Sequence, residues 1–186
     1  MWFAWSVLRA PVSAPGPVAE LTLGVTDSGV ALVCFGASAA TQRAALAEAA
    51  RRLGTPPVRD DARVAELSGE LTGYLAGRRR RFDYPVDWRL THGDQQVVLQ
   101  TLYREVEYGG SITYGELAVR SGAYRTEHGP GQAARRVGAI MGSNPVPIVV
   151  PCHRVLAADG LGGFGGGLES KRWLLGLEGV LPPTLF

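Results

Sequence analysis

The sequence has 186 residues, of which 46% are hydrophobic and 19% charged, and its formal net charge at pH 7 is +2. This composition excludes an intrinsically disordered chain, and the length suffices for one large domain or two small ones. Residues 1–89 hold 11 lysines and arginines against 9 acids, and residues 90–186 hold 8 against 8, so the bulk charge of neither half predicts a nucleic-acid partner.

The N-terminal residues and the two cysteines indicate in which cellular compartment the protein is expected. The start, Met1 to Arg9, lacks the basic region of a signal peptide and is soon interrupted by Pro11, so neither a signal peptide nor a membrane span is predicted. Cys34 and Cys152 lie in different segments and do not form the pattern of a disulfide framework. A reducing compartment is therefore favoured, and we expect a cytoplasmic protein.

Residues 1–89 are predicted to mix strands and helices. The segment 21–25 alternates with period two, and Asp27-Ser28-Gly29 is a turn with a glycine available for a positive φ, which predicts a hairpin. The predicted elements are strands over 21–25 and 30–35, a helix over 39–53, a second helix capped by Asp60 or Asp61 and ending at Gly77, and a short edge strand over 82–88.

Four consecutive arginines, Arg78 to Arg81, follow the second predicted helix. Such a run can bind phosphate, but behind a helix C-terminus it also complements the helix dipole and is usually a solvated loop. A contiguous run also lacks the one-sided arrangement of an electrostatic footprint. The pattern therefore favours a solvated loop, and contact with nucleic acid stays an alternative.

Residues 90–186 are predicted to be mostly helical. The spacing of apolar residues predicts four helices, over 94–106, from Thr113 to Ser121, from Ala133 to Met141 and over 169–178. The second of them begins with a capping box, Thr113-x-x-Glu116.

The second and third of these helices form a pair similar to a helix-turn-helix. Arg135 and Arg136 lie on the side of the third helix opposite its small apolar face. Helix pairs with exposed arginines are common, and the loop over 122–131 is longer than the three to four residues of the usual motif. The pair alone therefore indicates DNA binding only weakly.

A possible nucleophile follows the apolar run 148–150, which has the length of a buried strand and ends at a proline. Cys152 is followed directly by His153 and Arg154, and cations favour the thiolate, which is the form that attacks. We therefore interpret Cys152 as a nucleophile. Cys34 lies in an apolar run without ionisable neighbours and is interpreted as a core residue.

The last segment contains a glycine-rich loop and the final helix. Gly160 to Gly165 matches G-x-G-x-x-G, but no βαβ unit follows, so a dinucleotide site is excluded. The glycines permit close approach of the backbone to a flat ligand, over which we expect Phe164 to close. Trp173 is predicted to be a core residue. Glu178 is badly placed for the dipole at its helix end, which predicts either a solvated side chain or one held there for a partner, and the spacing alone favours the solvated one.

A family resemblance rests on Pro151-Cys152-His153-Arg154-Val155, with Asn144-Pro145 before it and the glycine loop and Lys171-Arg172-Trp173-Leu174-Leu175 after it. This pattern resembles the active-site signature of the O6-alkylguanine-DNA alkyltransferases, also called methylated-DNA-protein-cysteine S-methyltransferases, over residues 94–179 and more faintly before them. The resemblance implies a ribonuclease-H-like α/β domain at 1–89. It also implies a mostly α domain at 90–186 with a helix-turn-helix, winged-helix-like DNA-binding element.

The resemblance further implies a single-turnover reaction. The protein would bind double-stranded DNA as a monomer, flip out O6-alkylguanine and transfer the alkyl group irreversibly to Cys152, without a cofactor or metal. His153 would take the thiol proton through a water molecule, with Glu178 orienting the imidazole. Tyr114 would assist the departing guanine, with Lys171 as a supporting cation.

The resemblance assigns the other site residues as well. Asn144 would brace the turn before the active-site segment, and Arg135 would replace the flipped nucleotide in the duplex. The remaining implied residues are Met141, Phe164, Gly165 and the carbonyls of Cys152 and Val155 for the base, and Arg136, Thr113, Tyr114 and Ala134 for DNA.

Two other functions stay open at this stage. A lesion-sensing protein would flip alkylguanine without reacting, but relatives of that kind replace the cysteine. A thiol hydrolase with a Cys-His-Glu set would turn over repeatedly and ignore DNA. The zinc site of some relatives is not expected, because Cys34 stands without any histidine before His92.

Overall fold

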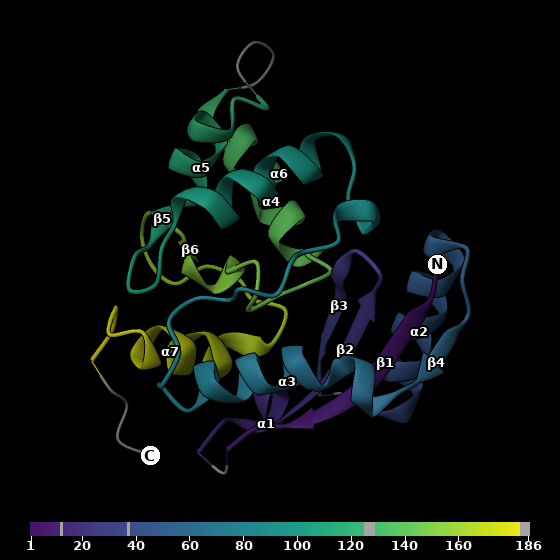
Figure 1. Ribbon diagram of the computed structural model, residues 1–186. Helices are drawn as coiled ribbons and strands as arrows, with labels where there is room; N and C mark the ends of the chain where they lie inside the picture. Colours follow the sequence, from purple (N-terminus) through teal and green to yellow (C-terminus); the bar gives the residue numbers. More distant parts are fainter. Residues whose placement is uncertain (12, 37, 125–128, 183–186) are drawn as a thin grey trace. The chain divides into compact units, whose positions relative to one another are not determined.

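The computed structural model describes residues 1–11, 13–36, 38–124 and 129–182. The chain divides into two compact units, Met1–Leu90 and Thr91–Phe186 (Figure 1). The first unit combines a four-stranded sheet with two long helices, and the described part of the second is mostly helical with a two-stranded sheet.

The sheet of the first unit has the strand order β3-β2-β1-β4. Its strands are β1 (Phe3–Arg9), β2 (Glu20–Thr26), β3 (Gly29–Phe35) and β4 (Pro57–Arg59). The predicted hairpin is confirmed, because β2 pairs antiparallel with β3. β1 pairs antiparallel with β2 and parallel with β4. The sequence pattern predicted neither β1 nor β4.

Two helices cover opposite faces of this sheet. α2 (Ala39–Leu53) contributes Leu46 and Leu53 to a core cluster that includes Phe3 of β1. Ser6, on the other face of β1 by strand alternation, donates a 2.6 Å hydrogen bond to Asp61 of α3 (Asp61–Leu75). The predicted apolar stripe of α3 is fully buried and consists of Val64, Leu67, Leu71, Tyr74 and Leu75.

Both helices have the boundaries that their capping residues predict. The Ser38 hydroxyl accepts from the N–H of Thr41 at the start of α2, and the Asp60 carboxylate accepts from the N–H of Arg63 at the start of α3. Gly54 ends α2 in the left-handed conformation with φ 67°. A short helix, α1 (Gly16–Ala19), precedes β2.

The edge strand predicted over 82–88 is wrong. Only an isolated bridge joins Val86 to Val30 of β3. The N–H groups of Asp83 and Tyr84 donate to the carboxylate of Glu70 instead of a strand, at 3.0 and 3.1 Å. Pro85 has no N–H to donate, so no ladder can propagate through this segment. A 3-10 turn, η1 (Trp88–Leu90), follows.

The arginine run is only partly solvated. Arg78, Arg80 and Arg81 are exposed, whereas Arg79 is half-buried and bonds Glu70 and Asp83, each at 2.6 Å. Arg79 therefore fixes the loop after α3, a role that a contiguous run of arginines does not reveal.

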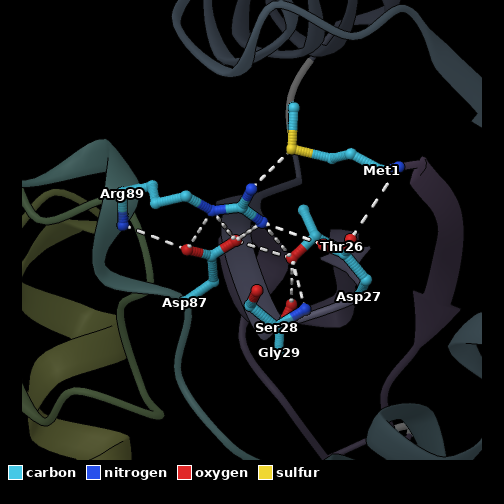
Figure 2. A network of polar contacts seen from close by, with 7 residues as sticks. All are labelled: Met1, Thr26, Asp27, Ser28, Gly29, Asp87 and Arg89. Atoms are coloured by element: carbon cyan, nitrogen blue, oxygen red, sulfur yellow. Dashed lines mark hydrogen bonds and ion pairs between the residues drawn. The ribbon is translucent and has the colours of Figure 1, made fainter.

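A polar network fastens the turn between β2 and β3 to the segment after α3 (Figure 2). The buried Asp87 accepts from the Thr26 hydroxyl at 2.6 Å and from three nitrogens of Arg89. Burial opposes ionisation of Asp87, but the hydrogen bonds from Arg89 and Thr26 outweigh it and hold the pKa of Asp87 below its usual value. Arg89 also bonds Asp27 and the sulfur of Met1.

Gly29 is required where this turn meets the chain after α3. Its φ is 134°, and a Cβ there would lie 2.2 Å from the carbonyl oxygen of Pro85. Cys34, farther along β3, is half-buried and free, so its interpretation as a fully buried core residue is only partly right.

The second unit contains four described helices and two short strands. They are α4 (Gly93–Glu105), β5 (Ile112–Thr113), α5 (Tyr114–Ser121), α6 (Pro130–Gly142), β6 (Val155–Leu156) and α7 (Gly167–Leu177). β5 and β6 pair in parallel. The capping box of α5 is confirmed, because Thr113 and Glu116 bond each other's backbone N–H at 2.8 and 3.2 Å.

The helices of this unit pack on one apolar core. Helix α5 packs against α6, and α4 contacts both. The fully buried side chains of these three helices are Val98, Leu99, Leu102, Leu117 and Val137. The apolar spacing that predicted the helices therefore also identified their packed faces.

Candidate active site

The strand predicted over 148–150 is wrong, and a tight turn precedes Cys152 instead. Pro147 and Val150 form an isolated bridge, and Ile148 between them has φ 74°. Prolines at 145, 147 and 151 remove backbone donors, so the segment cannot join a ladder. Its apolar side chains are buried all the same, as their sequence pattern predicted.

Asn144 holds this turn closed. Its Nδ2 donates to the carbonyl oxygen of Val150 at 2.9 Å, and its Oδ1 accepts from the N–H of Val146 at 3.1 Å. The Asn144 side chain also bonds the Cys152 thiol. The Asn144 side chain therefore links the end of α6 both to the backbone of this turn and to the Cys152 thiol.

Cys152, His153 and Arg154 form a 3-10 turn, η2. Adjacent side chains on an extended chain point in opposite directions, and the turn removes this separation. All three are buried, with exposed fractions of 4%, 0% and 7%. Cys152 lines a cavity, while His153 and Arg154 both bond Glu178.

Glu178 is buried and multiply bonded, so the solvated interpretation of its position is wrong. Its Oε1 lies 2.8 Å from Nε2 of His153, and Arg154 donates from Nε and Nη2 at 2.9 Å. The N–H of Gly109 adds a 3.3 Å bond. These partners lie 24 to 69 residues away, so local spacing could not indicate them.

Arg154 is a structural partner that the sequence analysis missed. Besides its fork on Glu178, its Nη1 donates to the carbonyl oxygen of Val106 at 2.6 Å. It therefore ties Glu178 to the end of α4. The only available signal was its position two residues after Cys152, which suggested a cation for the thiolate instead.

Burial and charge set the ionisation of the site. Burial raises the pKa of the Cys152 thiol to about 11, although the Asn144 bond and the Lys171 charge oppose this rise. Burial is the largest effect on His153 and lowers its pKa below the usual value, although the bond and charge of Glu178 oppose this. The pKa of Glu178 is held at about 2, because bonds from His153 and Arg154 outweigh its burial.

These charges define the tautomer of His153. An ionised Glu178 accepts the Nε2–H of a neutral imidazole, which leaves Nδ1 as the basic nitrogen. The ring of Phe164 lies edge-on at 6.4 Å between centroids. The site therefore contains a neutral thiol beside a neutral base with a buried carboxylate behind it.

A cavity of 580 Å³ opens in front of Cys152. Its lining residues are Tyr114, Ala134, Arg135, Gly138, Met141, Gly142, Cys152, Gly163, Phe164 and Gly165. Seven of these were predicted as site residues. The three additional glycines remove side chains from the wall, which leaves room for a flat ligand.

Several other predicted residues lie outside the cavity lining. Thr113 caps α5 through Glu116. The Arg136 guanidinium lies 5.7 Å from the ring centre of Tyr124, at the start of the long loop. Arg125 and His128 of this loop lie outside the described residues. The Val155 carbonyl accepts from Nζ of Lys171 at 2.6 Å, so Lys171 is already engaged with backbone.

Tyr114 and the glycine loop fit closely together. The Tyr114 hydroxyl bonds the carbonyl oxygen of Gly163 at 3.3 Å. Gly162 has φ 69°, and a Cβ on it would lie 2.7 Å from the Tyr114 ring. A glycine is required at this position for both reasons.

Replacing Gly162 by alanine is expected to lower the free energy of unfolding by about 1–2 kcal/mol, because alanine disfavours the left-handed conformation and displaces Tyr114. Denaturant titration measures this difference. Gly163→Ala is the matched control, since no atom lies within 4 Å of its added Cβ. We expect it to change the free energy by less than about 0.5 kcal/mol. Equal effects at both positions would contradict the steric argument.

Among the described residues, no group of three or more His, Cys, Asp or Glu side chains could hold a metal ion. Within the same part of the chain, no helix has the length and hydropathy needed to cross a membrane.

Comparison with known proteins places this site in a family. Residues 94–180 match the family model of the 6-O-methylguanine DNA methyltransferase DNA-binding domain. The methylated-DNA–protein-cysteine methyltransferase of Methanopyrus kandleri is 40% identical over 134 residues, covering 69% of this chain and 91% of the relative. That of Mycobacterium tuberculosis is 45% identical over 121 residues, covering 63% of this chain and 68% of the relative.

Solved structures agree with the sequence matches. The crystal structure of Mycobacterium tuberculosis OGT in complex with DNA is similar with a TM-score of 0.70 at 32% identity, covering 94% of this chain and 92% of that one. The O6-methylguanine-DNA methyltransferase of Pyrococcus kodakaraensis gives a TM-score of 0.61 at 28% identity, covering 96% and 99%. The chain therefore belongs to the methylated-DNA–protein-cysteine methyltransferase family.

Proposed function

We propose that this protein repairs alkylated DNA by transferring the alkyl group of O6-alkylguanine to its own Cys152 in a single turnover. The observation that carries the proposal is the position of Cys152, in the wall of a 580 Å³ cavity with His153 and Glu178 behind it. Family membership supports the same chemistry. A base inside a duplex is inaccessible to this thiol, so the substrate must be flipped out.

The reaction proceeds as an in-line displacement. Nδ1 of His153 takes the Cys152 proton through a water molecule, and the imidazolium is stabilised by Glu178. The sulfur forms a bond to the alkyl carbon while the bond from that carbon to O6 breaks, and its electron pair passes to the guanine. The guanine takes a proton from the Tyr114 hydroxyl. Tyr114 then regains a proton from solvent, and the His153 imidazolium releases its proton to solvent.

The product explains the single turnover. It is a thioether, whose carbon–sulfur bond no acid or base of this site can cleave. The high pKa of the Cys152 thiol, about 11, keeps it protonated at neutral pH, so its reaction depends on proton removal by His153. Reaction with other electrophiles is thereby limited before the alkylguanine enters.

The helix pair α5 and α6 supplies the DNA-binding surface in this proposal. Arg135 lies at the cavity on α6, where its guanidinium would fill the gap left by the flipped nucleotide. Ala134 would approach the duplex beside it, and Arg136 and Thr113 would contact the backbone. Met141, Phe164 and Gly165 would hold the base.

The finer architecture is part of the proposal as well. Residues 90–186 would form the DNA-binding and alkyl-acceptor domain, with a winged-helix-like element. Residues 1–89 would form a ribonuclease-H-like domain, which is supported by antiparallel β1, β2 and β3 with β4 parallel to β1. The protein would act as a monomer on double-stranded DNA that contains O6-alkylguanine.

Intact-protein mass spectrometry tests the proposal directly. The protein is incubated with a duplex that contains one O6-methylguanine, beside the Cys152→Ser variant and a Cys34→Ser control. We expect a gain of about 14 Da, once per protein, in the native protein and the control but not in Cys152→Ser. Binding of the duplex without a mass change would indicate a lesion-sensing protein. Neither binding nor a mass change would favour a thiol hydrolase.

A further inference from the structure

The side chain of Lys171 is fully buried and bonded to backbone on three sides. It extends from α7, and its exposed fraction is 0%. Its Nζ donates to the carbonyl oxygens of Val155 at 2.6 Å, of Leu161, and of Gly163 at 3.2 Å. An ammonium group has three N–H donors, and here three carbonyls receive them.

This arrangement differs from the role that the family resemblance implies for Lys171. A cation that assists the departing guanine needs a donor directed at the substrate. The three carbonyls already occupy the Nζ donors, and Lys171 is absent from the lining of the cavity in front of Cys152. The ring centre of Tyr114 lies 5.8 Å from Nζ.

The accepting carbonyls belong to the wall of the cavity. Gly163, Phe164 and Gly165 line it, and residues 161–164 belong to neither helix nor strand. Glycine-rich segments lose much conformational entropy when they are ordered, so this wall requires fixed anchors. Lys171 bonds the carbonyls of Leu161 and Gly163, on either side of Gly162, and so anchors the loop at two points. Its third bond, to the Val155 carbonyl, ties the Lys171 side chain to β6.

We propose that Lys171 is a positioning residue whose ammonium group holds the glycine loop in the shape that receives the flipped base. A neutral amine has only two N–H donors and a lone pair that repels the third carbonyl. Loss of one proton would therefore release part of the loop. The role of Lys171 in alkyl transfer rests on the proposed function, whereas its hold on the loop does not.

The titration of Lys171 gives this role a distinct signature. Burial lowers the pKa of Lys171 to about 8, which the charge of Cys152 partly opposes. The other ionisable groups that face Lys171 titrate outside the range from pH 7 to 9. The pKa of Cys152 is about 11, burial raises that of Tyr114 above its usual value of 10, and burial lowers that of His153 below 6.5. A transition between pH 7 and 9 therefore reports Lys171.

The first measurement follows the loop backbone of the native protein at pH 7, 8 and 9 through the ¹³Cα chemical shifts of residues 161–165, recorded by carbon-detected NMR. We expect these shifts to change between pH 7 and 9 with a midpoint near 8, while those of α4 stay constant. In Lys171→Met the loop shifts should differ from the native values already at pH 7 and should not depend on pH. Arg172→Met, which removes the exposed cation next to it on α7, should behave as the native protein. Constant loop shifts across these pH values in the native protein would overturn the proposal without any variant.

The second measurement is the single-turnover rate on a duplex that contains O6-methylguanine. For Lys171→Met we expect the limiting rate constant to fall about 10- to 100-fold, with affinity for undamaged duplex unchanged. The native profile should show an inflection near pH 8 that the variant lacks. A slower variant with native loop shifts would show that Lys171 acts on the substrate directly, and would overturn the proposal. A native protein that fails to take up the methyl group would instead overturn the proposed function and leave the chemical-shift result valid.

Discussion

Replacing Glu178 by glutamine is expected to slow alkyl transfer by about 10²- to 10⁴-fold. Glutamine keeps the shape of the side chain, but it removes the negative charge that lies 2.8 Å from Nε2 of His153. The imidazolium that forms when His153 takes the thiol proton then has no counter-charge. A carboxamide can also present its oxygen or its amino group to the ring, so the tautomer with basic Nδ1 is no longer enforced.

The single-turnover rate constant on a duplex with one O6-methylguanine measures this effect, with protein in excess. Glu169→Gln is the matched control, because Glu169 is an exposed glutamate on the first turn of the same helix, α7. The deficit of Glu178→Gln should shrink as the pH approaches about 11, where the Cys152 thiol ionises without a base. A rate within twofold of the native protein at pH 7 would exclude the proposed relay, in which His153 is the general base and Glu178 its charged partner.

Replacing Arg154 by methionine is expected to lower the free energy of unfolding by about 3–5 kcal/mol, because it leaves the buried Glu178 carboxylate without its main cation. It also removes the donor to the Val106 carbonyl. Denaturant titration at pH 7 measures the loss. Arg172→Met removes an exposed arginine from the adjoining helix and should change the free energy by less than about 0.5 kcal/mol.

The same variant should shift the acid limb of the pH–rate profile to higher pH. His153 has a lowered pKa chiefly because it is buried, and the positive charge of Arg154 lowers it further. Without that charge the pKa of His153 rises, so the imidazole is protonated and inactive as a base up to a higher pH. Arg154→Lys keeps the charge but not the fork on Glu178, and its acid limb should stay near that of the native protein. An unchanged limb in Arg154→Met would contradict this electrostatic role.

Local patterns were sufficient for most helices and for one hairpin. The stripe of α3, the cap at Asp60, the capping box at Thr113 and Glu116, and the turn at 27–29 all involve residues within a few positions of each other. Such interactions form between neighbours along the chain, so their spacing is visible in the sequence. The signature around Cys152 was sufficient to indicate the family for the same reason.

The two strand errors arise from competition for backbone donors. Asp83 and Tyr84 have strand-compatible positions, but the distant Glu70 accepts their N–H groups. The run 148–150 is apolar enough for a strand, yet Asn144 bonds the backbone at Val146, before the run, and at Val150, its last residue, and closes a turn. In both places a polar side chain outside the predicted strand determined where the backbone hydrogen bonds go.

The sequence by itself determined the family and the helical faces and predicted Cys152 as the nucleophile, because each depends on residues that are neighbours in the chain. Only the tertiary structure decided the environment of the charged residues. Glu178 is 24 residues from Arg154 and 25 from His153, and Lys171 is 8 to 16 residues from its three carbonyls. A charge at a helix end is stable in water or with buried partners. Folding decided between these because it brought the partners to Glu178 and excluded the solvent.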